Sequence, residues 1–122
     1  MKIIKTISLI TVLVFATSCL GKFVTNDNAE LYGTEWSDSD QTEGLKFLKG
    51  DSVVYFSPYC RATAHFDYDK STGNIVFDDI VANYTNFTAI ITNATIKGNT
   101  IYVAWHKLGG ADNYYMTFTR RR

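Results

Sequence analysis

The 122-residue sequence has little proline, cysteine or histidine, and no excess of charge of either sign. It contains one Pro, two Cys and two His, and its 12 Lys and Arg balance 12 Asp and Glu. A formal net charge of zero argues against a nucleic-acid binder, which depends on a basic surface. No apolar run reaches the ~20 residues of a membrane-spanning helix. An apolar fraction of 46% excludes a disordered chain, and the length allows one domain.

The first 19 residues, MKIIKTISLITVLVFATSC, combine the features of an export signal. Lys2 and Lys5 give a positive start, residues 7–15 form an apolar core too short to span a bilayer, and small residues lead to Cys19. This order resembles a bacterial lipoprotein signal, whose cysteine is lipidated on sulfur and becomes the mature N-terminus. The alternative is an ordinary cleaved secretory signal followed by a chance cysteine.

The resemblance implies a protein held on the lipid bilayer by acylated Cys19, because two or more acyl chains bind a membrane stably. We therefore expect a signal peptide over residues 1–18, an acylated cysteine with a flexible tether over 19–30, and a folded domain over 31–122. Residues 20–22 lack the acidic cluster of surface-exported lipoproteins. This favours a cell-envelope location at the outer membrane, facing the periplasm.

From Leu31 onward apolar residues recur with a period of two, and turn signals follow about every ten residues. The pattern predicts eight short strands, over residues 33–37, 45–47, 53–56, 62–69, 75–77, 87–95, 101–106 and 114–119. An open sheet of these strands would expose two edges and an apolar face. The sequence therefore predicts an all-β fold, an eight-stranded antiparallel up-and-down barrel. A two-sheet β-sandwich is the alternative.

Six short motifs lie along the predicted barrel: LYGTEW at 31–36, LKF at 45–47, YD at 68–69, GNI at 73–75, IKGNTI at 96–101 and YMTF at 115–118. Their order and spacing resemble the small lipocalin-like lipoproteins of the Bacteroidetes. The resemblance covers about residues 31–120 and implies a lipid-anchored β-barrel.

A barrel that binds a small apolar ligand needs inward aromatic side chains and unfilled volume. The candidates for a ligand pocket are Trp36, Phe47, Phe66, Tyr68, Phe77, Trp105 and Phe118. Strands of this length span ~17–26 Å, so large side chains tend to fill the interior. A packed core and a shallow apolar pocket at one mouth are both compatible with the pattern.

Residues with catalytic potential are scarce, since the chain has neither a nucleophile elbow nor a Cys/His pair at a known spacing. We therefore predict a protein that is not an enzyme and uses no cofactor. His65, Asp67 and Asp69 share one face of a predicted strand and are the sharpest metal candidates. Alternation on the polar outer face of a barrel strand alone predicts the same arrangement, and we therefore predict no metal site. Cys60 is either a reactive thiol or a half-buried small residue.

Two further signals concern the surface. Asp51-Ser52-Val53 resembles the O-glycosylation sequence of exported Bacteroidetes proteins, which makes Ser52 a glycosylation candidate. The basic end Arg120-Arg121-Arg122 either contacts anionic lipid headgroups or is a solvated terminus.

These observations favour a non-enzymatic, membrane-anchored envelope lipoprotein that binds a small apolar ligand or an envelope protein. One alternative is an envelope inhibitor of a hydrolase or lysozyme, which would act through the loops at 59–61 or 107–110. Another is a structural subunit of an envelope complex. We expect a monomer with no nucleic-acid partner.

Overall fold

The computed structural model describes residues 27–122 of the chain. The predicted signal peptide, Cys19 and the first part of the predicted tether lie outside the described residues. Within residues 27–122, no helix has the length and apolar character needed to cross a membrane.

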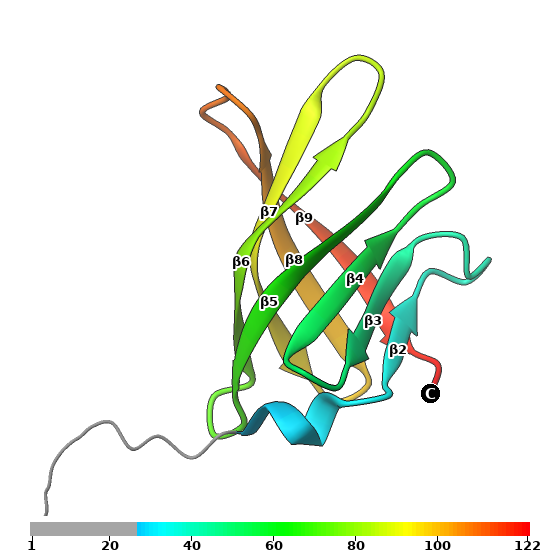
Figure 1. The fold of residues 1–122 in the computed structure, drawn as a ribbon, viewed down its shortest axis with the longest axis vertical. Helices are drawn as coiled ribbons and strands as arrows, with labels where there is room; N and C mark the ends of the chain where they lie inside the picture. Colours follow the sequence, from blue (N-terminus) through cyan, green and yellow to red (C-terminus); the bar gives the residue numbers. More distant parts are fainter. Residues whose placement is uncertain (1–26) are drawn as a thin grey trace, which may run out of the picture.

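Eight antiparallel strands form one closed barrel (Figure 1). The strands are β2 (Glu35–Ser37), β3 (Gly44–Leu48), β4 (Ser52–Phe56), β5 (Arg61–Asp69), β6 (Asn74–Asn83), β7 (Thr88–Lys97), β8 (Thr100–Lys107) and β9 (Asn113–Arg120). Each strand pairs with the next along the chain, and β2 also pairs with β9. The predicted eight-stranded up-and-down barrel is confirmed, and the sandwich alternative is wrong.

A short 3-10 helix, η2 (Asp27–Leu31), lies against the lower end of the barrel in Figure 1. The buried Asn28 side chain donates to the Phe66 carbonyl at 2.9 Å and accepts from the Tyr68 N–H at 2.7 Å. Leu31 is buried in the barrel core. The structure thus corrects the end of the predicted tether: residues 27–30 are docked on β5 because a buried amide takes two backbone partners there.

Side chains alternate between the inside and the outside of the barrel, as β5 shows most clearly. Phe66 is fully buried, whereas His65, Asp67 and Asp69 are exposed. The Phe66 ring meets the Phe47 ring edge to face, with centroids 4.9 Å apart and an interplanar angle of 78°. The predicted alternation along this strand is confirmed.

Two changes of register interrupt the sheet, one in the ladder between β6 and β7 and one in the ladder between β7 and β8. One lies between Val76 and Ile80 of β6, and the other lies between Ile91 and Asn93 of β7. At the first, Asp79 adopts a left-handed φ of 37°. Such irregularities increase the local twist, and the hairpin of β6 and β7 bends along its length in Figure 1.

Substitution of the two neighbouring β5 residues tests this arrangement. Phe66→Ala removes a ring from a packed interior and should lower the free energy of unfolding by ~3–5 kcal/mol. His65→Ala, on the exposed face, should lower it by no more than ~0.5 kcal/mol. Denaturant unfolding of both variants measures the difference, and a larger loss at His65 than at Phe66 would contradict the orientation of β5.

Candidate functional site

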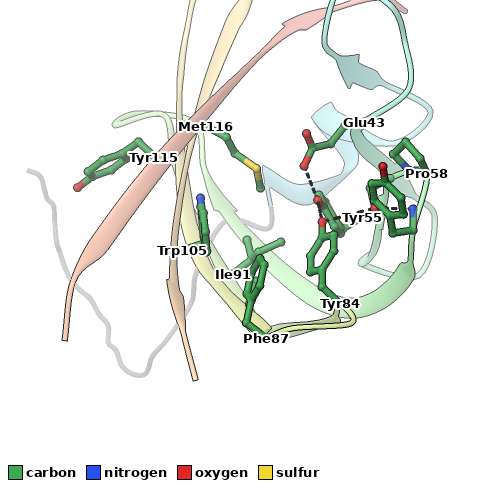
Figure 2. A pocket seen from close by; sticks show the side chains of 12 residues that line it. Glu43, Tyr55, Pro58, Tyr84, Phe87, Ile91, Trp105, Tyr115 and Met116 are labelled. Carbon is green, nitrogen blue, oxygen red and sulfur yellow. Dashed lines mark hydrogen bonds between the residues drawn. The ribbon is translucent and has the colours of Figure 1, made fainter. Parts of the chain in front are cut away.

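An open cavity of about 440 Å³ lies in one mouth of the barrel (Figure 2). It is lined by Ser57 and Tyr59, which lead into the start of β5, whereas η2 docks near the end of the same strand. The cavity and η2 therefore lie at opposite ends of the barrel. The aromatic residues that line the cavity are Tyr55, Tyr59, Tyr84, Phe87, Trp105 and Tyr115.

Small side chains leave the space for this cavity. Ala82 of β6 and Ala89 of β7 pair with each other, and both are buried. Ala62 of β5 pairs with Tyr55 of β4 and lies partly buried against the core. An alanine side chain ends at Cβ, so this end of the barrel keeps volume that larger side chains fill at the η2 end.

Of the seven predicted pocket residues, Trp105 alone lines the cavity. The structure corrects the prediction for the other six, which pack elsewhere in the barrel. Trp36, Phe47, Phe66, Phe77 and Phe118 are at most 3% exposed and form the core. Tyr68 is half-buried beside η2, where its N–H donates to Asn28. The barrel thus combines a filled end and an open mouth.

A polar cluster of three residues lies at one side of the cavity. The Tyr55 hydroxyl donates to the Glu43 carboxylate and is also hydrogen-bonded to the Tyr84 hydroxyl (Figure 2). Glu43 precedes β3, and its N–H donates to the Asp38 carboxylate at 3.3 Å while the Asp38 N–H donates to its carbonyl at 3.0 Å. These backbone bonds hold the Glu43 side chain at the mouth.

Burial shifts the pKa of the two tyrosines in this cluster. It raises the pKa of Tyr55 well above its usual value, and the hydrogen bonds to Glu43 and Tyr84 raise it further. Burial also raises the pKa of Tyr84. The shifts move the ionisation of both hydroxyls further into the alkaline range, and the Tyr55 hydroxyl donates to the Glu43 carboxylate.

A continuous row of rings crosses the mouth, and we refer to these five residues as the aromatic row. Its order is Tyr59, Tyr84, Phe87, Trp105 and Tyr114. The rings of Tyr84 and Phe87 stack with centroids 5.0 Å apart, and those of Trp105 and Tyr114 stack at 4.7 Å. Tyr59, at one end, is 81% exposed. Four of its five rings, all but Tyr114, also line the cavity.

Sequence reasoning missed Glu43, Tyr84 and Phe87 as cavity residues because they stand in or next to loops, where no alternation marks an inward side chain. Tyr55 lies on the inward face that the alternation along β4 predicts. Alternation alone, however, does not say at which end of the barrel a side chain lies. The alanines at inward positions of β5, β6 and β7 are the signal that points to unfilled volume at this end.

The predicted metal candidates do not converge on one point. His65 Nδ1 lies 3.9 Å from a carboxylate oxygen of Asp67 and 4.0 Å from one of Asp78, and His65 Nε2 lies 4.0 Å from Asp51 of the β3–β4 turn. Asp69 instead accepts from the Ser71 N–H at 3.0 Å and the Ser71 hydroxyl at 2.6 Å in the β5–β6 turn. Among the residues that the structure describes, no three His, Cys, Asp or Glu side chains are placed to hold a metal ion.

The remaining candidates lie on strands and loops around the barrel. Cys60 is a half-buried free thiol with Sγ 3.5 Å from the Ser57 hydroxyl. Ser52, the glycosylation candidate, is half-buried at the start of β4. The two loops considered for an inhibitor expose one large hydrophobic side chain each, Tyr59 and Leu108.

Comparison of the chain with protein-family models, curated proteins and solved structures finds no match. A barrel fold by itself does not determine function.

The raised pKa values of Tyr55 and Tyr84 predict a loss of stability in alkali. As the pH rises past ~10, the unfolded chain releases these protons before the folded chain does. The contribution of both tyrosines to the free energy of unfolding is therefore complete below this pH and declines above it. Tyr55→Phe should make that decline shallower, whereas Tyr115→Phe, at an exposed position, should not.

Denaturant unfolding across the alkaline range measures the decline, and tyrosinate absorbance follows the tyrosines directly. If all eight tyrosines ionise together near pH ~10 while the barrel stays folded, the buried environment assigned to Tyr55 is wrong.

Proposed function

We propose that this protein is a non-enzymatic binding protein of the cell envelope that takes a small, largely apolar molecule into the mouth of its barrel. The observation that carries the proposal is the cavity of about 440 Å³, walled mainly by aromatic and aliphatic side chains with one polar cluster. Small-molecule sites commonly have volumes of ~300–1,000 Å³ and this composition.

The two sides of the cavity suit two parts of such a ligand. Figure 2 shows Trp105 and Met116 facing the cavity from one side, and Glu43, Tyr55 and Tyr84 from the other. The first side offers apolar contact, and the second offers a carboxylate and hydroxyl groups. A molecule with an apolar body and one polar group fits this division.

The polar groups of the cavity favour binding over catalysis. Ser57 Oγ accepts from the N–H groups of Tyr59 and Cys60, each at 3.2 Å, and lies 3.4 Å from the Tyr84 hydroxyl. None of these partners is a general base able to activate a serine nucleophile. The tyrosine hydroxyls, with their raised pKa values, are donors and weak acids at neutral pH.

Anchoring through Cys19 completes the proposal and orients the mouth. Seven residues separate Cys19 from Asp27, where the described chain begins at the η2 end of the barrel. Even fully extended, such a segment spans only ~25 Å. The bilayer would therefore lie nearer the η2 end, and the cavity would open toward the aqueous compartment, which we infer to be the periplasm.

Tryptophan fluorescence tests ligand binding at the mouth. The chain has two tryptophans, of which Trp36 is buried in the core and Trp105 lines the cavity. Titration with 1-octanol, a small apolar probe, should change the Trp105 emission in a saturable way. Ala89→Phe adds a ring at the cavity wall and should weaken binding about tenfold or more, because a filled cavity excludes the probe.

The matched control is Ala29→Phe, at an exposed position of η2. It should leave probe binding unchanged. A titration without saturable change in Trp105 emission, or equal weakening by both substitutions, would refute binding at the mouth.

Replacement of Cys19 by alanine tests the anchor. The wild-type protein should be found in the membrane fraction and should take up a labelled fatty acid, because acyl chains on Cys19 hold it there. The Cys19→Ala protein should take up no label and should leave the membrane fraction. The anchor is disproved if the wild type takes up no label and the variant stays membrane-bound.

A further inference from the structure

The cavity in the mouth has an asymmetric electrostatic character. Of the side chains that line it, Glu43 alone carries a charge, and the others are aromatic, aliphatic or hydroxyl-bearing. The faces of aromatic rings are electronegative and attract cations. The carboxylate and the rings therefore both favour a positive group and disfavour a negative one.

Glu43 has no cationic partner among residues 27–122, where the ion pairs involve other carboxylates. Its hydrogen bond from Tyr55 uses one of about four acceptor positions that a carboxylate offers. The Asp38 carboxylate accepts from the backbone of the same loop and adds a second negative charge nearby. The Glu43 carboxylate can thus bind a donor or a cation from a ligand.

One basic side chain that contacts the aromatic row lies outside the cavity lining. Lys107 is exposed, and its ammonium group lies 5.3 Å from the centre of the Phe87 ring. It does not line the cavity. The lysine therefore contacts Phe87, the middle ring of the aromatic row, and it is not placed over the rings of Tyr55, Tyr84 or Trp105.

We propose that the ligand of this cavity is an organic cation, an alkylamine or alkylammonium compound, whose charged head lies against Glu43 and whose apolar part lies along Trp105 and Met116. This inference rests on the proposed function, because it names the chemical class of the ligand for the same site. A half-buried carboxylate in a cavity lined mainly by aromatic side chains recognises an ammonium group better than an exposed carboxylate does.

Three probes with one alkyl chain and different head groups test the sign of the recognised charge. They are octyltrimethylammonium, 1-octanol and octanesulfonate, each titrated against the purified protein below its micelle concentration at neutral pH. Trp105 emission reports binding. We expect the ammonium compound to bind about tenfold or more tightly than 1-octanol, and the sulfonate to bind most weakly.

Glu43→Gln provides the matching substitution in the protein. Glutamine keeps the size of the side chain and an acceptor for the Tyr55 hydroxyl, but it removes the charge. Binding of octyltrimethylammonium should weaken about tenfold, while binding of 1-octanol, which also reports that the mouth is intact, should be unchanged. The control is Glu30→Gln in η2, which removes an equal charge far from the mouth and should alter neither affinity.

The outcomes separate this inference from the proposed function. Equal binding of the ammonium compound and 1-octanol, with no effect of Glu43→Gln, would overturn the cationic ligand and leave binding at the mouth intact. Tightest binding of the sulfonate would also overturn it. If none of the three probes changes Trp105 emission, both the cationic ligand and the proposed function are wrong.

Discussion

The barrel depends on a short seam between its first and last strands. Trp36 of β2 and Arg120 of β9 are paired there, and the Arg120 guanidinium lies 5.8 Å from the centre of the Trp36 ring. The next two residues extend the seam: the Arg121 N–H donates to the Glu35 carbonyl at 2.7 Å, and Arg122 forms an ion pair with the Glu35 carboxylate at 2.7 Å. The basic C-terminal end is therefore part of the barrel wall, not simply a solvated terminus.

Closure has two consequences for function. It removes the free sheet edges through which an open eight-stranded sheet would associate with other chains. It also makes the interior a fixed volume, which side chains either fill or leave empty. At the η2 end, Phe47, Phe66 and Leu31 fill it. At the mouth, where alanines take inward positions of β5, β6 and β7, the same closed wall encloses a cavity.

The sequence predicts the barrel well wherever the period of two is unbroken. Along β5 the alternation assigns every side chain to its correct face, because successive side chains of a regular strand point to opposite faces of the sheet. Alternation fails in β6 and β7, where Asp78 and Asp79 are both exposed and Ile90 and Ile91 are both buried. The changes of register in these strands explain the failure, because one extra residue shifts the phase of all that follow.

Long-range contacts limited prediction of the ends of the barrel. Asn28 reads as part of a polar linker, yet its side chain bonds to backbone groups 38 and 40 residues further along the chain. The cavity presents the same difficulty, since the register of eight strands decides which inward aromatic residues gather at which end. Composition and alternation predict an aromatic interior, but they do not divide it into a core and a pocket.

The polar cluster at the mouth joins the stability of the barrel to its proposed binding role. Tyr55 is 2% exposed, and a buried hydroxyl without a partner would cost stability, so its bonds to Glu43 and Tyr84 are needed for folding alone. These bonds also connect the start of β3, the middle of β4 and the end of β6. They fix the three side chains relative to one another, which would reduce the ordering that the proposed binding requires. The contacts that satisfy a buried tyrosine therefore also organise the site.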